Sequence, residues 1–262
     1  MFMLKVIDRK AKSIFTKSGI SDYSINQYVG CSHGCIYCYA KFMCKWKNYG
    51  FWGSWVEVKK NAPELVKGKL ISGEVFMSSV SDPYQAIEKE IMLTRRVLEN
   101  MDKHIKLSIL TKLDMVIRDI DLFKKFKSIE VGLTINGFDE EVRRFLEPNA
   151  PSNNKRINAL RTLHENGIKN YCFISPIIPD LVNIKNILEQ TRDFCDSYFF
   201  EFLNVKLAGN HFLRVVKENY PKSYEIFADH SKFLDFINQA KTDIEDYAKK
   251  KNIKIKGIIM HA

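Results

Sequence analysis

The 262-residue sequence lacks any apolar run that approaches the roughly 18 residues of a membrane span. Its first residues, MFMLKVIDRKAKSIF, alternate charged and apolar side chains and contain no uninterrupted apolar segment typical of a secretory signal. We therefore expect a cytoplasmic protein that does not associate with membranes. A reducing compartment disfavours structural disulfides among its six cysteines.

The sequence also lacks an internal repeat, a low-complexity tract, a long linker and any abrupt change in composition. A chain of this length forms one large domain or two small ones, with a well-buried core in either case. We predict a single domain over residues 1–262, with a core at about 22–205 and a C-terminal extension at about 206–262.

The sequence does contain a regular alternation of strand and helix patterns. Six apolar or alternating runs are predicted strands, with helical patterns between them; they span residues 23–29, 74–80, 105–111, 129–135, 171–176 and 197–205. Such an alternation predicts a parallel α/β fold, here a partial (β/α)6 barrel with a helical C-terminal extension and a final strand at 253–260. In such folds the functional residues lie at the carboxyl ends of the strands.

Three of the cysteines lie in the loop GCSHGCIYCYA, which follows the first predicted strand. Cys31, Cys35 and Cys38 have the spacing C-x3-C-x2-C. A zinc site is one interpretation, with His33 or Cys44 as a fourth ligand or with a water in that position. A closed iron–sulfur cluster needs four cysteines, whereas a cubane bound by three leaves one iron open for a substrate or cofactor. The spacing by itself leaves these alternatives open.

The loop and four strand-end motifs together resemble the radical SAM superfamily. NQYVGCSHGCIYCYA, followed by SSVSDPYQAIE, LTK, GLTI and ISPIIP, is similar to the branch that contains spore photoproduct lyase, a branch often called DNA-repair-photolyase-like. The resemblance implies a 4Fe-4S cluster bound by Cys31, Cys35 and Cys38, with S-adenosylmethionine on the open iron. It also implies an electron donor such as flavodoxin or ferredoxin. Reductive cleavage of S-adenosylmethionine would then yield a 5′-deoxyadenosyl radical that abstracts hydrogen from a substrate, while the protein positions the reactants.

The resemblance further implies a set of cofactor contacts at strand ends: Tyr37, Tyr39, Ser79, Asp82, Lys112, Thr134, Asn136 and Ser175. The two tyrosines are expected beside the adenosyl group, and the lysine is expected beside the carboxylate of the cofactor. Ser79 and Asp82 occupy the position at which many radical SAM enzymes have Gly-Gly-Glu for the amino group. A simpler interpretation of SDPYQ is a turn in which Asp82 caps the following helix.

One position departs from spore photoproduct lyase, which carries a hydrogen-donating cysteine at the end of its second strand. This chain has Val80 there, so we do not expect it to repair the spore photoproduct, and its catalytic residues are not assigned. Cys172 has the opposite strand parity to Ser175 and is predicted to point away from the barrel interior. Cys44 is the only other cysteine close to the cluster loop in sequence.

The net charge of +10, from 31 lysines and 10 arginines against 31 acidic residues, favours an anionic partner. Aromatic residues between Lys41 and Lys60 suit base stacking, although they suit a core beneath a loop as well. We therefore expect a nucleic acid or nucleotide as substrate and partner. The alternatives are a peptide or small metabolite, or a metal-containing nucleic-acid-binding protein without catalysis. We expect a monomer.

Overall fold

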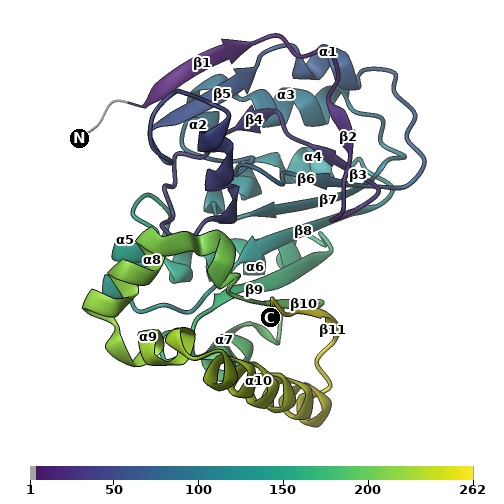
Figure 1. The fold of residues 1–262 in the computed structure, drawn as a ribbon. Helices are drawn as coiled ribbons and strands as arrows, with labels where there is room; N and C mark the ends of the chain where they lie inside the picture. The colour runs from purple at the N-terminus through teal and green to yellow at the C-terminus, as the bar shows by residue number, and fades with distance from the viewer. Residues whose placement is uncertain (1–3, 262) are drawn as a thin grey trace.

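The computed structural model describes residues 4–261, and its main feature is an eight-stranded sheet. Its strands are β2 (Phe15–Lys17), β3 (Tyr23–Ile25), β6 (Glu74–Met77), β7 (Lys106–Thr111), β8 (Ile129–Thr134), β9 (Asn170–Ile177), β10 (Tyr198–Phe202) and β11 (Ile255–Ile259). Their order is β11-β10-β9-β8-β7-β6-β3-β2, and every neighbouring pair except β2 and β3 is parallel. β2 and β11 are its edges, so the strand pairings among the described residues form a partial barrel of the predicted kind (Figure 1).

A second, three-stranded sheet, which the sequence patterns did not predict, contains β1 (Lys5–Arg9), β5 (Trp55–Lys59) and β4 (Tyr28–Val29). It also corrects the first predicted strand, because residues 23–29 divide into β3 and β4. The division has a physical reason in the two residues between them. Asn26 accepts hydrogen bonds from the backbone N–H groups of Ser79 and Val80, and buried Gln27 donates to Thr94 Oγ1 over 2.7 Å.

The helices follow the predicted alternation with strands. They are α1 (Ala62–Val66), α2 (Glu88–Ile91), α3 (Leu93–Asn100), α4 (Ile120–Phe123), α5 (Glu140–Leu146), α6 (Asn153–Glu165), α7 (Ile184–Thr191), α8 (Val205–Asn219), α9 (Pro221–Ala228) and α10 (His230–Lys251), with 3-10 segments η1 (Tyr39–Lys45) and η2 (Asp114–Asp119). The helices α2 and α3 are separated at Met92, which has the left-handed φ of 52°. Ser152 caps α6, since its side chain accepts from Lys155 N.

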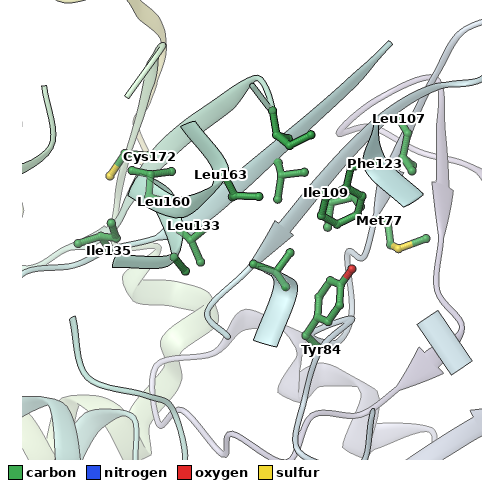
Figure 2. Close-up of a cluster of buried hydrophobic side chains, with 14 of the residues drawn as sticks. Met77, Tyr84, Leu107, Ile109, Phe123, Leu133, Ile135, Leu160, Leu163 and Cys172 are labelled. Atoms are coloured by element: carbon green, nitrogen blue, oxygen red, sulfur yellow. The ribbon is translucent and has the colours of Figure 1, made fainter. Parts of the chain in front are cut away.

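Alternate strand residues face the helices and form the main core. Figure 2 shows Leu160 and Leu163 of α6 beside Leu133 of β8 and Cys172 of β9, all fully buried. Each such aliphatic side chain contributes about 1.5–3 kcal/mol through burial. Cys172 therefore points away from the face that carries Ser175, as its strand parity predicted.

The chain ends as predicted, with a helical extension and a final strand. Helices α8 to α10 follow β10 and lie together on one side of the sheet (Figure 1). β11 then returns parallel to β10, so its carboxyl end reaches the same edge as those of the other parallel strands. The assignment of residues 1–262 to one domain stays a prediction. None of the helices in residues 4–261 is both long and apolar enough to cross a membrane.

Candidate cofactor site

A cavity of about 180 Å³ lies at the carboxyl ends of the parallel strands. All three loop cysteines line it, and so do seven of the eight predicted cofactor contacts: Tyr37, Tyr39, Ser79, Asp82, Lys112, Thr134 and Ser175. Asn136 does not line the cavity, because it is fully buried behind it. The fold thus brings together side chains that are more than 140 residues apart in sequence.

The cysteine loop is fastened on one side by Gln85, which the sequence patterns did not single out. Its side-chain oxygen accepts from Ser32 N over 2.9 Å, and its amide nitrogen donates to Gly30 O over 3.2 Å. Gly30 itself has a φ of +85°, and a Cβ there would lie 2.7 Å from the ring of Trp55. The entry to the loop therefore requires glycine and is held in place by a buried amide.

The segment after α5 fastens the other side of the loop. Asn149 donates from its side chain to Ser32 O over 2.9 Å and from its backbone to His33 O over 3.3 Å. Ile36 N donates to Leu146 O over 3.0 Å. These contacts hold the cysteine loop against the end of α5 and the residues that follow it.

Cys31 and Cys35 are buried and Cys38 is partly buried, and desolvation raises the pKa of each thiol. It raises the pKa of Cys31 to about 12, and for Cys35 the negative charge of Glu147 adds to the effect. The positive charges of Lys112 and Lys41 act in the opposite direction on the pKa of Cys38. Buried thiols of this kind become thiolates when a metal compensates the charge.

A further observation fits a bound iron–sulfur cluster. Ser32 Oγ and His33 Nε2 are buried without any hydrogen-bond partner, and both belong to the loop that carries the cysteines.

Asp82 joins the loop after β6 to the end of β7. Its carboxylate accepts from Thr111 Oγ1 over 2.6 Å and from Lys112 N over 2.8 Å. It also accepts from Tyr84 N over 2.9 Å, which forms the turn of the simpler interpretation. Asp82 does not cap a helix, however, because the next helix, α2, begins at Glu88 and has no side-chain cap. Asp82 therefore forms a turn and lines the cavity at once. On the same wall, the hydroxyl of Tyr39 donates to Ser79 O.

Behind the cavity lies a buried network around Glu147. Its carboxylate accepts from Tyr37 OH, from Arg156 Nη2 and, over 2.8 Å, from Asn136 Nδ2. Lys112 Nζ lies 3.7 Å from the same carboxylate. Burial by itself raises the pKa of Glu147, but the charges of Arg156 and Lys112 outweigh it and lower the pKa to about 2.

The sequence patterns did not single out Glu147 and Arg156. The available signal was a Glu-Pro dipeptide at the end of α5, followed by an arginine in α6. Neither feature by itself indicates that the two side chains meet. Asn136, which was also predicted as a cofactor contact, contacts this network instead of the cavity.

The aromatic and basic segment after the cysteines divides between core and surface. Trp55 is fully buried and meets Tyr49 and Trp52 edge-on, and Trp52 also lines the cavity. Trp46 is 75% exposed and Phe51 is 60% exposed. Trp55 thus belongs to a core beneath the loop, whereas Trp46 and Phe51 are exposed, as residues that stack on bases must be.

The profile of the Radical SAM superfamily matches residues 25–189, and the chain belongs to that superfamily. It is 54% identical over 260 residues to "Uncharacterized protein MJ0683" of Methanocaldococcus jannaschii, a match that covers 98% of each chain. It is 28% identical over 175 residues to "Uncharacterized protein ORF301" of Acidianus two-tailed virus, covering 60% of this chain and 56% of that one.

Solved structures of spore photoproduct lyase share the fold. One, "complexed with dinucleoside spore photoproduct", superposes with a TM-score of 0.59 at 19% identity, covering 83% of this chain and 66% of the lyase. A double mutant of the lyase "with bound AdoMet and dinucleoside spore photoproduct" gives a TM-score of 0.59 at 18% identity. The predicted superfamily is confirmed, and the likeness to the lyase structures shows a shared fold. Membership implies an enzyme with S-adenosylmethionine-dependent radical chemistry.

Proposed function

We propose that this chain binds a 4Fe-4S cluster through Cys31, Cys35 and Cys38 and cleaves S-adenosylmethionine reductively to abstract hydrogen from a substrate. The observation that carries the proposal is the shared cavity, in which two buried thiols and the partly buried Cys38 meet polar side chains from several strand ends. When bound, the cluster supplies the electron that cleaves the sulfonium S–C5′ bond, and S-adenosylmethionine supplies the radical.

The side chains around the cavity suit different parts of S-adenosylmethionine. Burial by itself lowers the pKa of Lys112, but nearby negative charges, chiefly Glu147, raise it, so the ammonium stays charged and can bind a carboxylate. The hydroxyls of Thr134 and Ser175 are hydrogen-bonding groups in the same cavity. Tyr37 and Tyr39 offer ring surface for the adenosyl group, since their hydroxyls are engaged with protein acceptors.

A nucleic acid or nucleotide is the substrate class that we propose. Support comes from the net charge of +10, the exposed Trp46 beside basic residues, and the dinucleoside bound in the lyase structures. Spore photoproduct repair is not proposed. Val80 occupies the expected cysteine position, and its backbone N–H donates to Asn26 over 3.1 Å. The alternatives remain a peptide or small-metabolite substrate and a non-catalytic metal-containing nucleic-acid-binding protein.

The proposal extends to the cellular setting. We propose a cytoplasmic monomer that receives electrons from a flavodoxin or ferredoxin. A donor of this kind is required because reductive cleavage consumes an electron that the chain itself does not generate.

The decisive experiment is anaerobic reconstitution with iron and sulfide, reduction with dithionite, and detection of 5′-deoxyadenosine and methionine by mass spectrometry. We expect about four irons per chain and formation of both products. Cys35→Ala should abolish both, whereas the matched variant Cys44→Ala should retain them, since Cys44 does not line the cavity. Zinc as the only metal, or a cluster that leaves S-adenosylmethionine intact, would overturn the proposal.

The substrate class has its own test. Perdeuterated DNA, RNA and nucleotide pools are incubated separately with the reduced enzyme, and deuterium in 5′-deoxyadenosine is measured. Deuterium from one nucleic-acid pool supports the proposed class. Transfer from a deuterated peptide or metabolite extract, with none from nucleic acids, would replace it with the alternative.

A further inference from the structure

Glu147 reaches the cavity only through other side chains. It is fully buried and does not line the cavity, yet it contacts two residues that do. Tyr37 donates its hydroxyl hydrogen bond to Glu147, and Lys112 Nζ lies 3.7 Å from Glu147 Oε1. One carboxylate thus fixes both an aromatic ring and a cation of the candidate cofactor site.

Two cations of this network, Lys112 and Arg156, face one carboxylate. Arg156 is fully buried, and it also donates to the carbonyl groups of Thr134 and Pro151. Lys112 lines the cavity together with the carboxylates of Asp82 and Glu201, so its ammonium is the cation of this network that a ligand can reach.

Glu147 also stands close to the cysteine loop. Leu146, its neighbour in sequence, accepts a hydrogen bond from Ile36 N, which adjoins Cys35. Tyr37, whose hydroxyl donates to Glu147, lies between Cys35 and Cys38 in the same loop. A fixed charge this close to a ligand changes the reduction potential of a bound cluster.

We propose that Glu147 is a positioning residue that orients Lys112 and Tyr37 toward S-adenosylmethionine and lowers the reduction potential of the cluster. This inference rests on the proposed function. It goes further than the proposed function because it gives Glu147 two roles, in the placement of S-adenosylmethionine and in the reduction potential of the cluster. Glu147 itself contacts neither group.

Glu88 provides a matched control. It too is a fully buried carboxylate that accepts from a tyrosine hydroxyl, Tyr28, and pairs with an arginine, Arg118. It does not line the cavity. Glu88→Gln therefore reports the general cost of neutralising a buried carboxylate, without any effect on cofactor placement.

The test uses the reconstituted chain and two readouts that do not depend on turnover. These are the dissociation constant for S-adenosylmethionine with the oxidised cluster and the midpoint potential of the cluster from a redox titration followed by EPR. Glu147→Gln should weaken S-adenosylmethionine binding by about tenfold or more and raise the midpoint potential, because a negative charge is lost. Glu88→Gln should change neither. Equal effects of the two variants, or wild-type values in Glu147→Gln, would overturn the inference.

A double variant keeps the test valid if Glu147→Gln does not fold. Glu147→Gln with Arg156→Met removes one charge of each sign, and replacing both partners of a buried pair is better tolerated than removing one. We expect its midpoint potential to return toward the wild-type value while S-adenosylmethionine binding stays weak, because Lys112 still lacks its partner. Wild-type binding in this variant would refute the positioning role.

The two proposals fail in different ways. If the wild-type chain neither assembles a cluster nor cleaves S-adenosylmethionine, the proposed function fails. If the wild type does both and Glu147→Gln matches it in affinity and potential, only the role of Glu147 fails.

Discussion

Ser175 Oγ at the end of β9 donates a hydrogen bond to Glu201 Oε2 on β10 over 2.6 Å. The other oxygen of Glu201 lies 3.1 Å from His261 Nε2, which the last strand brings to the same edge. Both Ser175 and Glu201 line the cavity. The hydrogen bond between Ser175 and Glu201 therefore links the ends of β9 and β10. Ser175 is one of the cofactor contacts predicted from sequence.

The first prediction concerns Ser175. Ser175→Ala removes a hydroxyl that faces the cavity, and we expect S-adenosylmethionine binding to weaken by about 0.5–1.5 kcal/mol, the usual net value of one hydrogen bond. Isothermal titration calorimetry of the cluster-loaded protein measures this binding free energy. Ser197→Ala is the control, because Ser197 Oγ is buried without a partner and should not affect binding. Identical affinities in the two variants would contradict a contact at Ser175.

The second prediction concerns the anchoring of the cysteine loop. Gln85→Ala leaves Ser32 N and Gly30 O without their side-chain partner, at a cost of about 1–3 kcal/mol for each buried group left unpaired. We expect faster loss of iron from the reconstituted protein, followed by its visible absorbance. The exposed Gln239→Ala should lose iron at the wild-type rate. Unchanged retention in Gln85→Ala would show that the loop holds its shape without this amide.

The third prediction tests the barrel interior. A Cβ added at Gly132 would lie 2.2 Å from the ring of Tyr171, so Gly132→Ala forces a rearrangement. We expect a loss of about 1–3 kcal/mol in the free energy of unfolding, measured with denaturant. Gly19→Ala meets no atom within 4 Å and should change stability by less than about 0.5 kcal/mol. Equal stabilities would mean that the ring moves aside freely.

The fourth prediction concerns acid stability. The pKa of Glu147 falls from its ordinary value of 4.5 to about 2 in the folded protein. A lowered pKa stabilises the fold above the unfolded value, and this contribution disappears as the pH falls from about 4.5 toward 2. The free energy of unfolding of the wild type should decrease over this window more steeply than that of Glu147→Gln. Parallel pH profiles for the two proteins would be evidence against a charged, paired Glu147.

The fifth prediction concerns nucleic acid. Trp46 is 75% exposed, and stacking of one base on such a ring contributes about 1–3 kcal/mol. Trp46→Ala should weaken binding of single-stranded DNA or RNA by that amount in fluorescence anisotropy, and wild-type affinity should fall as salt increases. Leu70→Ala changes an apolar residue that is 81% exposed and should have no effect. Equal binding by all three proteins would place the nucleic-acid surface elsewhere.

The alternation of strands and helices was predictable because it depends on local periodicity. All six predicted strands correspond to parallel strands of the large sheet, and their ends converge, as the carboxyl ends of neighbouring parallel strands must. The spacing of Cys31, Cys35 and Cys38 is local as well. The break between β3 and β4 was not predictable from residues 23–29, because it depends on amide contacts with Ser79 and Thr94, more than 50 positions away.

The amino-acid sequence by itself determined the fold class and the spacing of the three cysteines, because short-range patterns encode both. The strand-end polar residues followed from the resemblance to the superfamily. Only the tertiary structure decided which polar groups meet. It turned Asn136 away from the cavity, placed Glu147 between Arg156 and Lys112, and brought His261 to Glu201. The physical reason is that burying a charge requires a partner, and in this chain each partner comes from a different element, so no local pattern could identify it.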